Sequence, residues 1–441
     1  MSIFSSLTRE QKETVGLLQI GTFLEYFDLM LYVHMAVVLN DLFFPKTDPH
    51  TAALLAAFAF CSTYVLRPIG ALVFGYIGDN IGRKPTVIIT TMMMAVSCII
   101  MANLPTYAEI GIAAAWLVTA CRITQGLSSM GEIMGAEIYV TEITKPPVQY
   151  PTVAFVGVAA YAGTVVALAI ASLVTHFTFN WRIAFWIGAC IAVVGSIART
   201  RLRETPEFLQ KRHQRNNERS ANVSFVQEKM VRKTFWAYFI VYCGWPLSFY
   251  LAYMYFNPIL KNTFGYTSGE IILHNFVLSV ISLVTIVFLG VLSYKIHPLK
   301  IIKARGRLFL LLNFAIPFVI LYSTCAIHIF FLQVAILTFT LSPIPSVSVF
   351  IKYIPTLRRF TAASFVYALS RALMYVITSF SLVYLTDIFG YYGLWLIMFP
   401  VTFAFLWGVQ HFEELEQESG ALAKKNSLLP DTILTNSRAA S

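Results

Sequence analysis

Charged and polar residues interrupt several otherwise apolar segments of this 441-residue chain. Glu25 and Asp28 lie three residues apart in one such segment, so they share a face of a helix. A second segment carries polar residues at intervals of three, four and three positions, namely Arg122, Gln125, Ser129 and Glu132. An ionisable group at the centre of a bilayer costs about 2.5–3.5 kcal/mol on insertion scales, and it therefore indicates a function.

Two more arginines lie inside apolar segments. Arg67 precedes Asp79 by 12 residues, or about 18 Å along a helix, which places it deep in its segment. Arg371 lies one helical turn from both Tyr367 and Tyr375, on one inward stripe. Together these acids and arginines predict a network in which an acid changes charge as an arginine exchanges partners. The alternative is a set of static pairs that only assist packing, and Arg371 could bind a carboxylate or neutralise an acid of the first segment.

Aromatic residues are dense in one further apolar segment. They are Trp236, Tyr238, Tyr242, Trp245, Tyr250, Tyr253 and Tyr255. Such a wall could hold a quaternary ammonium group by cation–π attraction, which is worth about 0.5–2 kcal/mol. Aromatic side chains at helical spacing also pack cores and anchor helices at membrane interfaces. The sequence leaves both interpretations open.

The elements that position these residues are predicted to be membrane-spanning helices. The chain is 57% hydrophobic and 12% charged, against about 45–50% and about 25% in soluble domains. A spanning helix needs about 20 mostly apolar residues. Twelve segments meet this requirement: 17–41, 51–78, 85–103, 109–136, 152–178, 182–199, 234–260, 270–293, 307–324, 326–350, 361–386 and 391–410. The predicted fold is all-α, with twelve transmembrane helices in two six-helix halves.

The basic residues predict how these helices are oriented. Of the 32 Lys and Arg residues, 26 fall on the side that holds both termini, three fall on the opposite side and three lie within spans. Cytoplasmic loops collect Lys and Arg, so both termini are predicted to be cytoplasmic in a multi-pass protein of the cell inner membrane. This placement also explains the net charge of +10 without a nucleic-acid partner.

Four regions follow from the spans. Residues 1–200 form an N-terminal six-helix half, and 201–233 form a basic cytoplasmic linker. Residues 234–410 form a C-terminal six-helix half, and 411–441 a short cytoplasmic tail. Parallel halves of this kind build transporters whose solute site lies between them at mid-membrane.

Other classes of site find no support in the sequence. The six cysteines lie in apolar stretches without zinc-like spacing, and the eight histidines show no metal-ligand spacing. The chain contains no phosphate-binding loop of the GxxxxGK[ST] type. We therefore expect neither a metal nor a cofactor, and a protein that is not an enzyme.

A cluster of small and charged residues lies between the second and third predicted spans. It consists of Gly75, Asp79, Gly82, Arg83 and Lys84. Small residues let two helices approach closely, and an acid with a nearby basic pair can hold or release them. The cluster therefore predicts a cytoplasmic gate. It resembles the loop signature of the major facilitator superfamily, from which it departs at Asn80, where the family usually has a basic residue.

Further segments narrow this resemblance to one branch. In order along the chain they are Gly21–Tyr32, Leu66–Gly70, Arg122–Glu132, Trp181–Phe185 and Glu204–Phe208. They are similar to the metabolite:proton symporter branch of the superfamily, and most similar to its proline/betaine transporters, over about residues 17–210. The second half matches this branch less well, with Lys352, Tyr294 and Ala368 at positions where the family has other residues.

The resemblance implies proton-coupled symport of a small zwitterionic osmolyte or amino acid by alternating access. The expected partners are a small solute, protons and the lipid bilayer. The protein is expected to function as a monomer. Proton or coupling sites are then expected among Glu25, Asp28 and Glu132. Solute or coupling partners are expected among Arg67, Arg122, Gln125, Arg371 and Tyr367. The alternatives are a dicarboxylate or tricarboxylate proton symporter and a non-transporting membrane sensor that retains the fold.

The topology can be tested with single cysteines in a background without the native six. A thiol reagent that cannot cross the membrane should label cysteines at Asp48 and Lys261 in intact cells. A cysteine at Ser220 should be labelled only after lysis, because the basic linker is predicted to lie inside. Labelling of position 220 in intact cells would contradict the predicted orientation.

Overall fold

A computed structural model describes residues 7–45, 49–81, 83–129, 133–177, 180–199, 232–355 and 359–420. The described residues are largely helical, and no strand occurs among them. Two residues of the predicted sites, Gly82 and Glu132, lie outside the described residues. The side chains of Asp79, Arg83 and Lys84 lie outside the described set as well, although their backbones belong to helices.

Helices of the first half follow the predicted spans. They are α1 (Arg9–Phe43), α2 (Pro49–Val65), α3 (Arg67–Asn80), α4 (Arg83–Asn103), the short α5 (Tyr107–Ile110), α6 (Ile112–Ser128), α7 (Ile133–Ile143), α8 (Gln149–His176) and α9 (Arg182–Arg199). The second predicted span is broken into α2 and α3 at Leu66. Pro68 lies in the first turn of α3, where its missing N–H costs no hydrogen bond.

The second half shows the same agreement and two irregular spans. Its helices are α11 (Arg232–Tyr250), α12 (Phe256–Asn262), α13 (Ser268–Lys295), α14 (Pro298–Leu321), α15 (Ala326–Thr338), α16 (Val347–Lys352), α17 (Arg359–Phe389) and α18 (Trp395–Glu418). A π-helical stretch, Leu251–Tyr255, joins α11 to α12. The tenth predicted span, 326–350, is not one helix, because the chain leaves helical geometry between α15 and α16.

Length and composition support membrane crossing. Six helical stretches of the described residues are long and apolar enough to cross a membrane, and the last of them, 359–418, holds both α17 and α18. Three shorter apolar helices, 88–103, 182–191 and 326–338, cover three further predicted spans. With α1, and with α6 and α7 together, each of the twelve predicted spans coincides with helix, so the prediction of twelve spans in two six-helix halves is confirmed.

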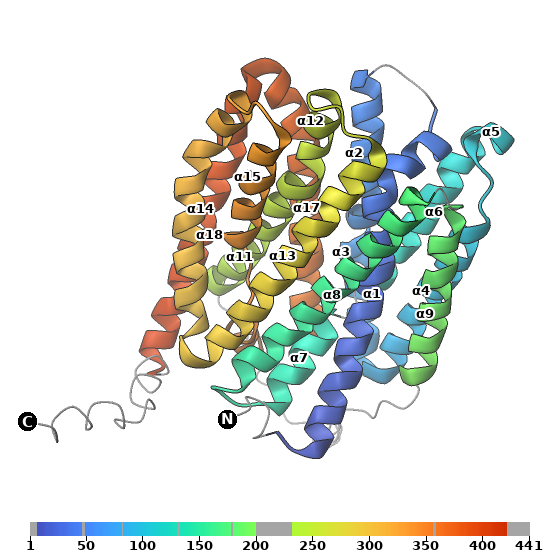
Figure 1. Ribbon diagram of the computed structural model, residues 1–441. Helices are drawn as coiled ribbons and strands as arrows, with labels where there is room; N and C mark the ends of the chain where they lie inside the picture. The colour runs from blue at the N-terminus through green and yellow to red at the C-terminus, as the bar shows by residue number, and fades with distance from the viewer. Residues whose placement is uncertain are drawn as a thin grey trace, which may run out of the picture.

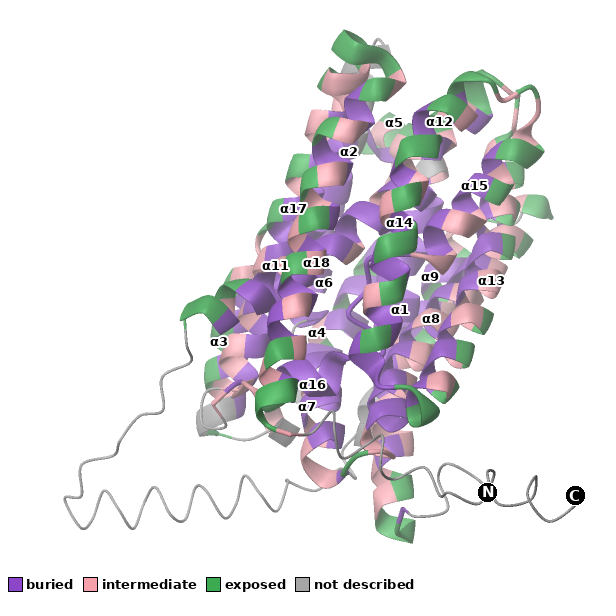
Figure 2. Cartoon of the chain, turned by 90° about the vertical axis from the view of Figure 1, so that its left-hand side faces the viewer, coloured by how far each residue is buried: buried purple, intermediate pink, exposed green. Residues whose placement is uncertain are grey.

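The two halves lie side by side, with α8 against α13 and α3 against α17 (Figure 1). Helix α1 begins and α18 ends at the same end of the bundle, which we call the terminal end. Buried residues fill the interior, and exposed ones follow the outer faces (Figure 2). Large apolar side chains are exposed there, Trp116 at 67% and Leu311 at 66%, which suits a surface facing lipid.

Small residues allow the closest helix contacts in the first half. A Cβ atom added to Gly126 of α6 would lie 1.8 Å from the Thr63 carbonyl oxygen of α2. One added to Gly163 of α8 would lie 2.3 Å from the Phe23 carbonyl oxygen of α1. In a membrane, such close backbone approach supplies much of the packing between helices.

Gly126→Ala should therefore separate α6 from α2 and sharply reduce the yield of folded protein. Gly16→Ala is the matched control, because a Cβ at Gly16 of α1 meets nothing within 4 Å. Alanine is favoured over glycine in a helix by about 1 kcal/mol, so the control should fold at least as well as the parent. The measurement is the monodisperse fraction and unfolding temperature in detergent. Equal values for both variants would contradict the packing described here.

Candidate functional site

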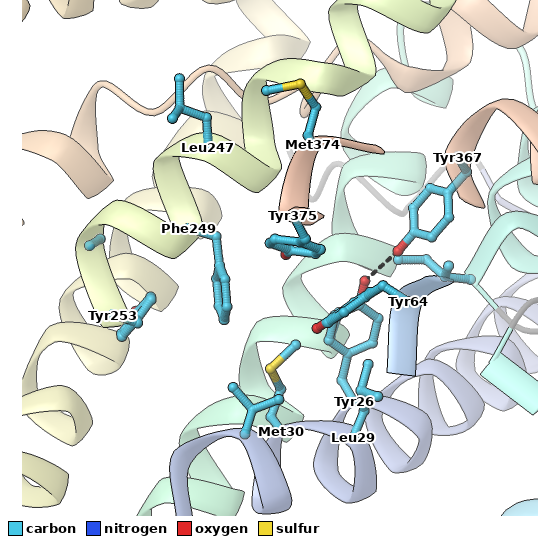
Figure 3. Close-up of a cluster of buried hydrophobic side chains, with 14 of the residues drawn as sticks. Tyr26, Leu29, Met30, Tyr64, Leu247, Phe249, Tyr253, Tyr367, Met374 and Tyr375 are labelled. Atoms are coloured by element: carbon cyan, nitrogen blue, oxygen red, sulfur yellow. Dashed lines mark hydrogen bonds between the residues drawn. The ribbon is translucent and has the colours of Figure 1, made fainter. Parts of the chain in front are cut away.

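Polar side chains from both halves meet in the middle of the bundle. The hydroxyl of Tyr26 in α1 lies 2.6 Å from the hydroxyl of Tyr367 in α17 (Figure 3). The Arg371 guanidinium lies over the Tyr367 ring, 3.4 Å from its centroid, and 4.9 Å from the Trp245 centroid. Each of these side chains is largely or fully shielded from solvent. The inward stripe expected on α17 thus contacts the first half directly.

An aromatic layer covers this centre on the side away from the terminal end. Tyr64 of α2 lies 4.2 Å from Tyr375 of α17, and Phe60 lies 4.9 Å from Tyr375, between ring centroids. Phe60 also contacts Tyr250 of α11 at 5.5 Å. The Arg67 guanidinium lies 4.2 Å from the Tyr64 ring centroid. Rings from the two halves therefore close the centre on that side (Figure 3).

A second polar cluster lies within the first half. The Arg122 guanidinium stacks on Tyr32 of α1 at 4.0 Å and donates a hydrogen bond to Gln125 at 3.1 Å. Gln125 reaches the thiol of Cys98 in α4, 3.6 Å away, and Asp28 also bonds to that thiol. The predicted stripe of α6 is therefore buried between helices of one half. Its last member, Glu132, lies outside the described residues.

The two acids of α1 point into different environments. Glu25 lies within electrostatic range of Tyr26 and Tyr367, at the contact between the halves. Asp28 faces α9 as well as α4, since a Cβ built on Gly188 would lie 2.7 Å from its Oδ1 atom. The two acids share one face of α1 but point in different directions from it. Glu25 points to the centre between the halves, and Asp28 points into the first half.

One buried acid at the centre was not among the predicted site residues. Glu137 of α7 is 3% exposed and lies within electrostatic range of Arg371. It also acts electrostatically on Tyr238 and Tyr242 of α11. Glu137 directly follows the predicted span 109–136, and nothing in the sequence indicated that its face meets the second half.

The terminal end of the bundle is closed by contacts between the halves. Glu142 at the end of α7 pairs with Arg359 at the start of α17, with 2.8 Å between Oε1 and Nη1. A Cβ on Gly75 would lie 3.1 Å from the Thr361 Cα atom. Gly75 thus permits the close approach of α3 and α17 that the predicted gate requires. The charged members of that predicted gate have no described side chains, and the ion pair seen here was not predicted.

A second charged cluster fixes the end of α18. Glu416 accepts hydrogen bonds from Lys352 at 2.8 Å and from Tyr353 at 2.7 Å, and its other oxygen lies 3.6 Å from His297. Burial alone would raise the pKa of this carboxyl. Its contact with His297 and its bonds from Lys352 and Tyr353 outweigh burial and hold the pKa at about 2. Glu416 lies beyond the predicted span 391–410, at the terminal end.

A cavity of about 940 Å³ lies toward the opposite end, between α1, α8, α9 and α13. Helices of both halves line it. Among its lining residues are Met35, His176, Arg182, Thr267 and Glu270. The cavity adjoins α1 next to His34, whose ring contacts Tyr253 of the second half at 5.3 Å. The bundle therefore has a cavity between the halves near this end, while contacts between the halves close the terminal end.

Residues 18–379 match the family model of the Major Facilitator Superfamily. The chain belongs to this superfamily. The match spans most of both halves and includes every predicted coupling and solute residue, from Glu25 to Arg371. It covers the break at Leu66, the π-helical stretch and the Glu142–Arg359 pair as well.

Curated relatives are similar over part of their length. The inner membrane metabolite transport protein YhjE of Escherichia coli is 36% identical over 197 residues, which are 43% of this chain and 45% of the relative. The proline/betaine transporter of Escherichia coli is 29% identical over 273 residues, 59% of this chain and 55% of the relative. The chain thus spans about half the length of the curated relatives it matches.

Solved structures share the fold over nearly the whole chain. The proton:xylose symporter XylE, from Escherichia coli, has a TM-score of 0.71 at 16% identity and covers 92% of this chain and 95% of its own. The human organic anion transporter MFSD10 has a TM-score of 0.65 at 14% identity, covering 92% and 100%. At these identities the likeness shows the fold alone.

The Glu416 cluster predicts a stability that depends on pH. A depressed folded pKa contributes stability above the ordinary glutamate pKa of 4.5, and that contribution is lost as pH falls toward about 2. Glu416→Gln should lower the free energy of unfolding by about 2–3 kcal/mol at pH 7, and by less at pH 3. Glu418→Gln, in the exposed last turn of α18, is the control. A deficit as large at pH 3 as at pH 7, by thermal unfolding in detergent, would contradict this assignment.

Proposed function

We propose that this protein is a secondary active transporter that carries a small zwitterionic osmolyte or amino acid together with protons. The observation that carries this proposal is Arg371, buried between the halves and held by aromatic faces rather than by an acid of the described residues. A guanidinium in this setting is suited to binding a carboxylate. The names of the curated relatives, which include proline/betaine transporters, support the same class of solute.

The surroundings of Arg371 suit the other end of a zwitterion. Tyr242 lies 6.0 Å from Tyr367 between ring centroids, and Tyr238 lies 4.7 Å from Tyr242. Aromatic faces attract an ammonium group by about 0.5–2 kcal/mol. A solute with a carboxylate and an ammonium group would find a complementary group for each.

Transport would proceed by alternating access. The ion pair Glu142–Arg359 closes the terminal end, and the rings of Tyr64 and Tyr375 lie between the centre and the cavity near the opposite end. In the other state Glu142 and Arg359 would separate, and Asp79, Gly82, Arg83 and Lys84 would release α3 from α17. Glu25, Asp28 and Glu132 are the coupling acids proposed from the sequence, with Arg67, Arg122 and Gln125 as partners. Both termini and the linker 201–233 would lie in the cytoplasm, and a monomer would be sufficient.

A dicarboxylate or tricarboxylate symporter is the second candidate. It is favoured by Arg67, a second buried guanidinium that stacks on Tyr64, next to Tyr375 and the centre. Arg122 is less suited to this function, since it is buried in the first half against Tyr32. A sensor that retained the fold would bind a solute at the same centre but would not move it.

Uptake of labelled proline, betaine, α-ketoglutarate and citrate into proteoliposomes, with and without a pH gradient, tests the proposal. Proline or betaine should accumulate only when the gradient is imposed. Accumulation of α-ketoglutarate or citrate alone would support the second candidate. Saturable binding of a panel member to purified protein without any uptake would indicate the sensor and overturn the transport proposal.

The closing ion pair offers a test with an internal rescue. Glu142→Arg and Arg359→Glu should each shift the halves toward the state open at the terminal end, by about tenfold or more in the ratio of states. The double charge reversal should restore much of the closed state. The readout is alkylation of a cysteine at Thr361, which packs against Gly75 when that end is closed.

Lys233 and Glu414 provide the matched control pair. They lie 3.8 Å apart and are about half exposed, and an exposed ion pair of this kind is worth little. Reversing their charges should leave the alkylation rate at position 361 unchanged. If the double reversal at 142 and 359 behaves like the sum of the singles, the pair does not act as a closing contact.

A further inference from the structure

Glu137 is a buried carboxylate with an incomplete set of partners. It lies on α7, is 3% exposed, and its Oε2 atom accepts no hydrogen bond from any described residue. A buried, unpaired polar atom costs about 1–3 kcal/mol, and more when it is charged. A carboxylate placed this way is expected to have a second state, in which that cost is relieved.

Five elements surround this carboxylate. Helices α17 and α11 supply its charged and titratable neighbours, which are Arg371, Tyr238 and Tyr242. Helix α1 contributes Tyr26, bonded to Tyr367, and Glu25 beyond it. The cation of α16, Lys352, is engaged by Glu416, and Tyr161 of α8 accepts a hydrogen bond from Trp245. Among the described residues, Arg371 is therefore the cation that acts on Glu137.

Most N–H donors of the Arg371 guanidinium have no hydrogen-bond partner among the described residues. Its guanidinium can donate five hydrogen bonds. Among the described residues its one hydrogen bond goes from Nη1 to the Tyr367 carbonyl oxygen, at a long 3.5 Å. Its position is otherwise set by stacking on Tyr367 and Trp245. No carboxylate of the described residues forms an ion pair with Arg371 within 4.0 Å. The guanidinium is therefore available to pair with a carboxylate.

We propose that Glu137 and the carboxylate of the transported solute compete for Arg371, so that the solute binds only when Glu137 carries a proton. This inference rests on the proposed function and adds to it the acid that couples solute to proton. One buried guanidinium balances one negative charge. The ammonium group of a zwitterionic solute is engaged by Tyr238 and Tyr242 in the proposed function, so a second carboxylate beside Arg371 would be a locally uncompensated negative charge, which is costly in this medium. A proton taken from the solution by the Glu137 carboxylate removes that charge.

The location of Glu137 gives the coupling a direction. It precedes Glu142 by five residues on α7, or about 7.5 Å along the helix toward the centre. Glu137 therefore lies between Arg371 and the closing pair Glu142–Arg359. When the halves separate at the terminal end, Glu137 is the first buried acid of α7 to meet the solution there. Release of the solute frees Arg371, which then favours loss of the proton to that side.

The first test measures solute affinity against pH with purified full-length protein. Binding of proline or betaine should weaken by about tenfold per pH unit once Glu137 is ionised, because one proton must be bound with each solute. Glu137→Gln should bind with less than about twofold change over the same range. Glu109→Gln, an exposed acid of α5, is the control and should behave as the parent. Loss of the pH dependence in Glu25→Gln but not in Glu137→Gln would overturn the proposal.

The second test needs no solute, so it separates this proposal from the proposed function. Trp245 lies under the Arg371 guanidinium, and its fluorescence should change with pH as Arg371 gains or loses Glu137. The change should be absent in Trp245→Phe and in Glu137→Gln. Glu137→Asp, which keeps a carboxylate, should retain it and also shows that the site tolerates substitution. An unaltered titration in a folded Glu137→Gln protein would refute the competition, whereas failure of every solute to bind would count against the proposed function alone.

Discussion

Three arginines buried among the helices share one arrangement: each guanidinium lies on the face of a tyrosine. Arg67 stacks on Tyr64, Arg122 on Tyr32 and Arg371 on Tyr367, at 4.2, 4.0 and 3.4 Å from the ring centroids. A positive charge away from water must be compensated by its surroundings. Aromatic faces compensate it in part without occupying its hydrogen-bond donors.

This arrangement explains why the centre of the bundle is rich in tyrosine. A carboxylate paired to each arginine would fix the charge and occupy the guanidinium. A ring leaves the guanidinium in place and ready for a second partner. The halves touch through the same tyrosines, since Tyr26 bonds to Tyr367 and Tyr64 contacts Tyr375. The contacts that hold the charges are therefore also the contacts that would change if the halves moved.

The closed terminal end depends on a different constraint. Glycines at Gly75 and Gly78 bring α3 against Thr361 and Phe360 of α17. Among the described residues, the closure therefore combines tight packing with the ion pair Glu142–Arg359 between α7 and α17. Packing of this kind has little tolerance for intermediate separations. The contact between α3 and α17 therefore has two favourable arrangements, packed together or separated. Solved structures of this superfamily include proton symporters. The cluster around Glu416 lies within the second half and next to α8, and it keeps α16 and α18 together at the same end.

The sequence by itself determined the helices, because a segment of sufficient length and apolarity is stable in lipid only as a helix. It also identified the polar residues within them and the superfamily, and each of the twelve spans was found. It could not determine which acid meets which arginine. Asp28 and Glu25 share a helical face, yet one faces Cys98 and the other lies beside Tyr367. The pair Glu142–Arg359 joins residues 217 positions apart, and Glu137 reaches Arg371 only because α7 packs on α17. Such contacts depend on how helices distant in sequence are rotated and packed, and a single segment carries no information about the face that its partner presents.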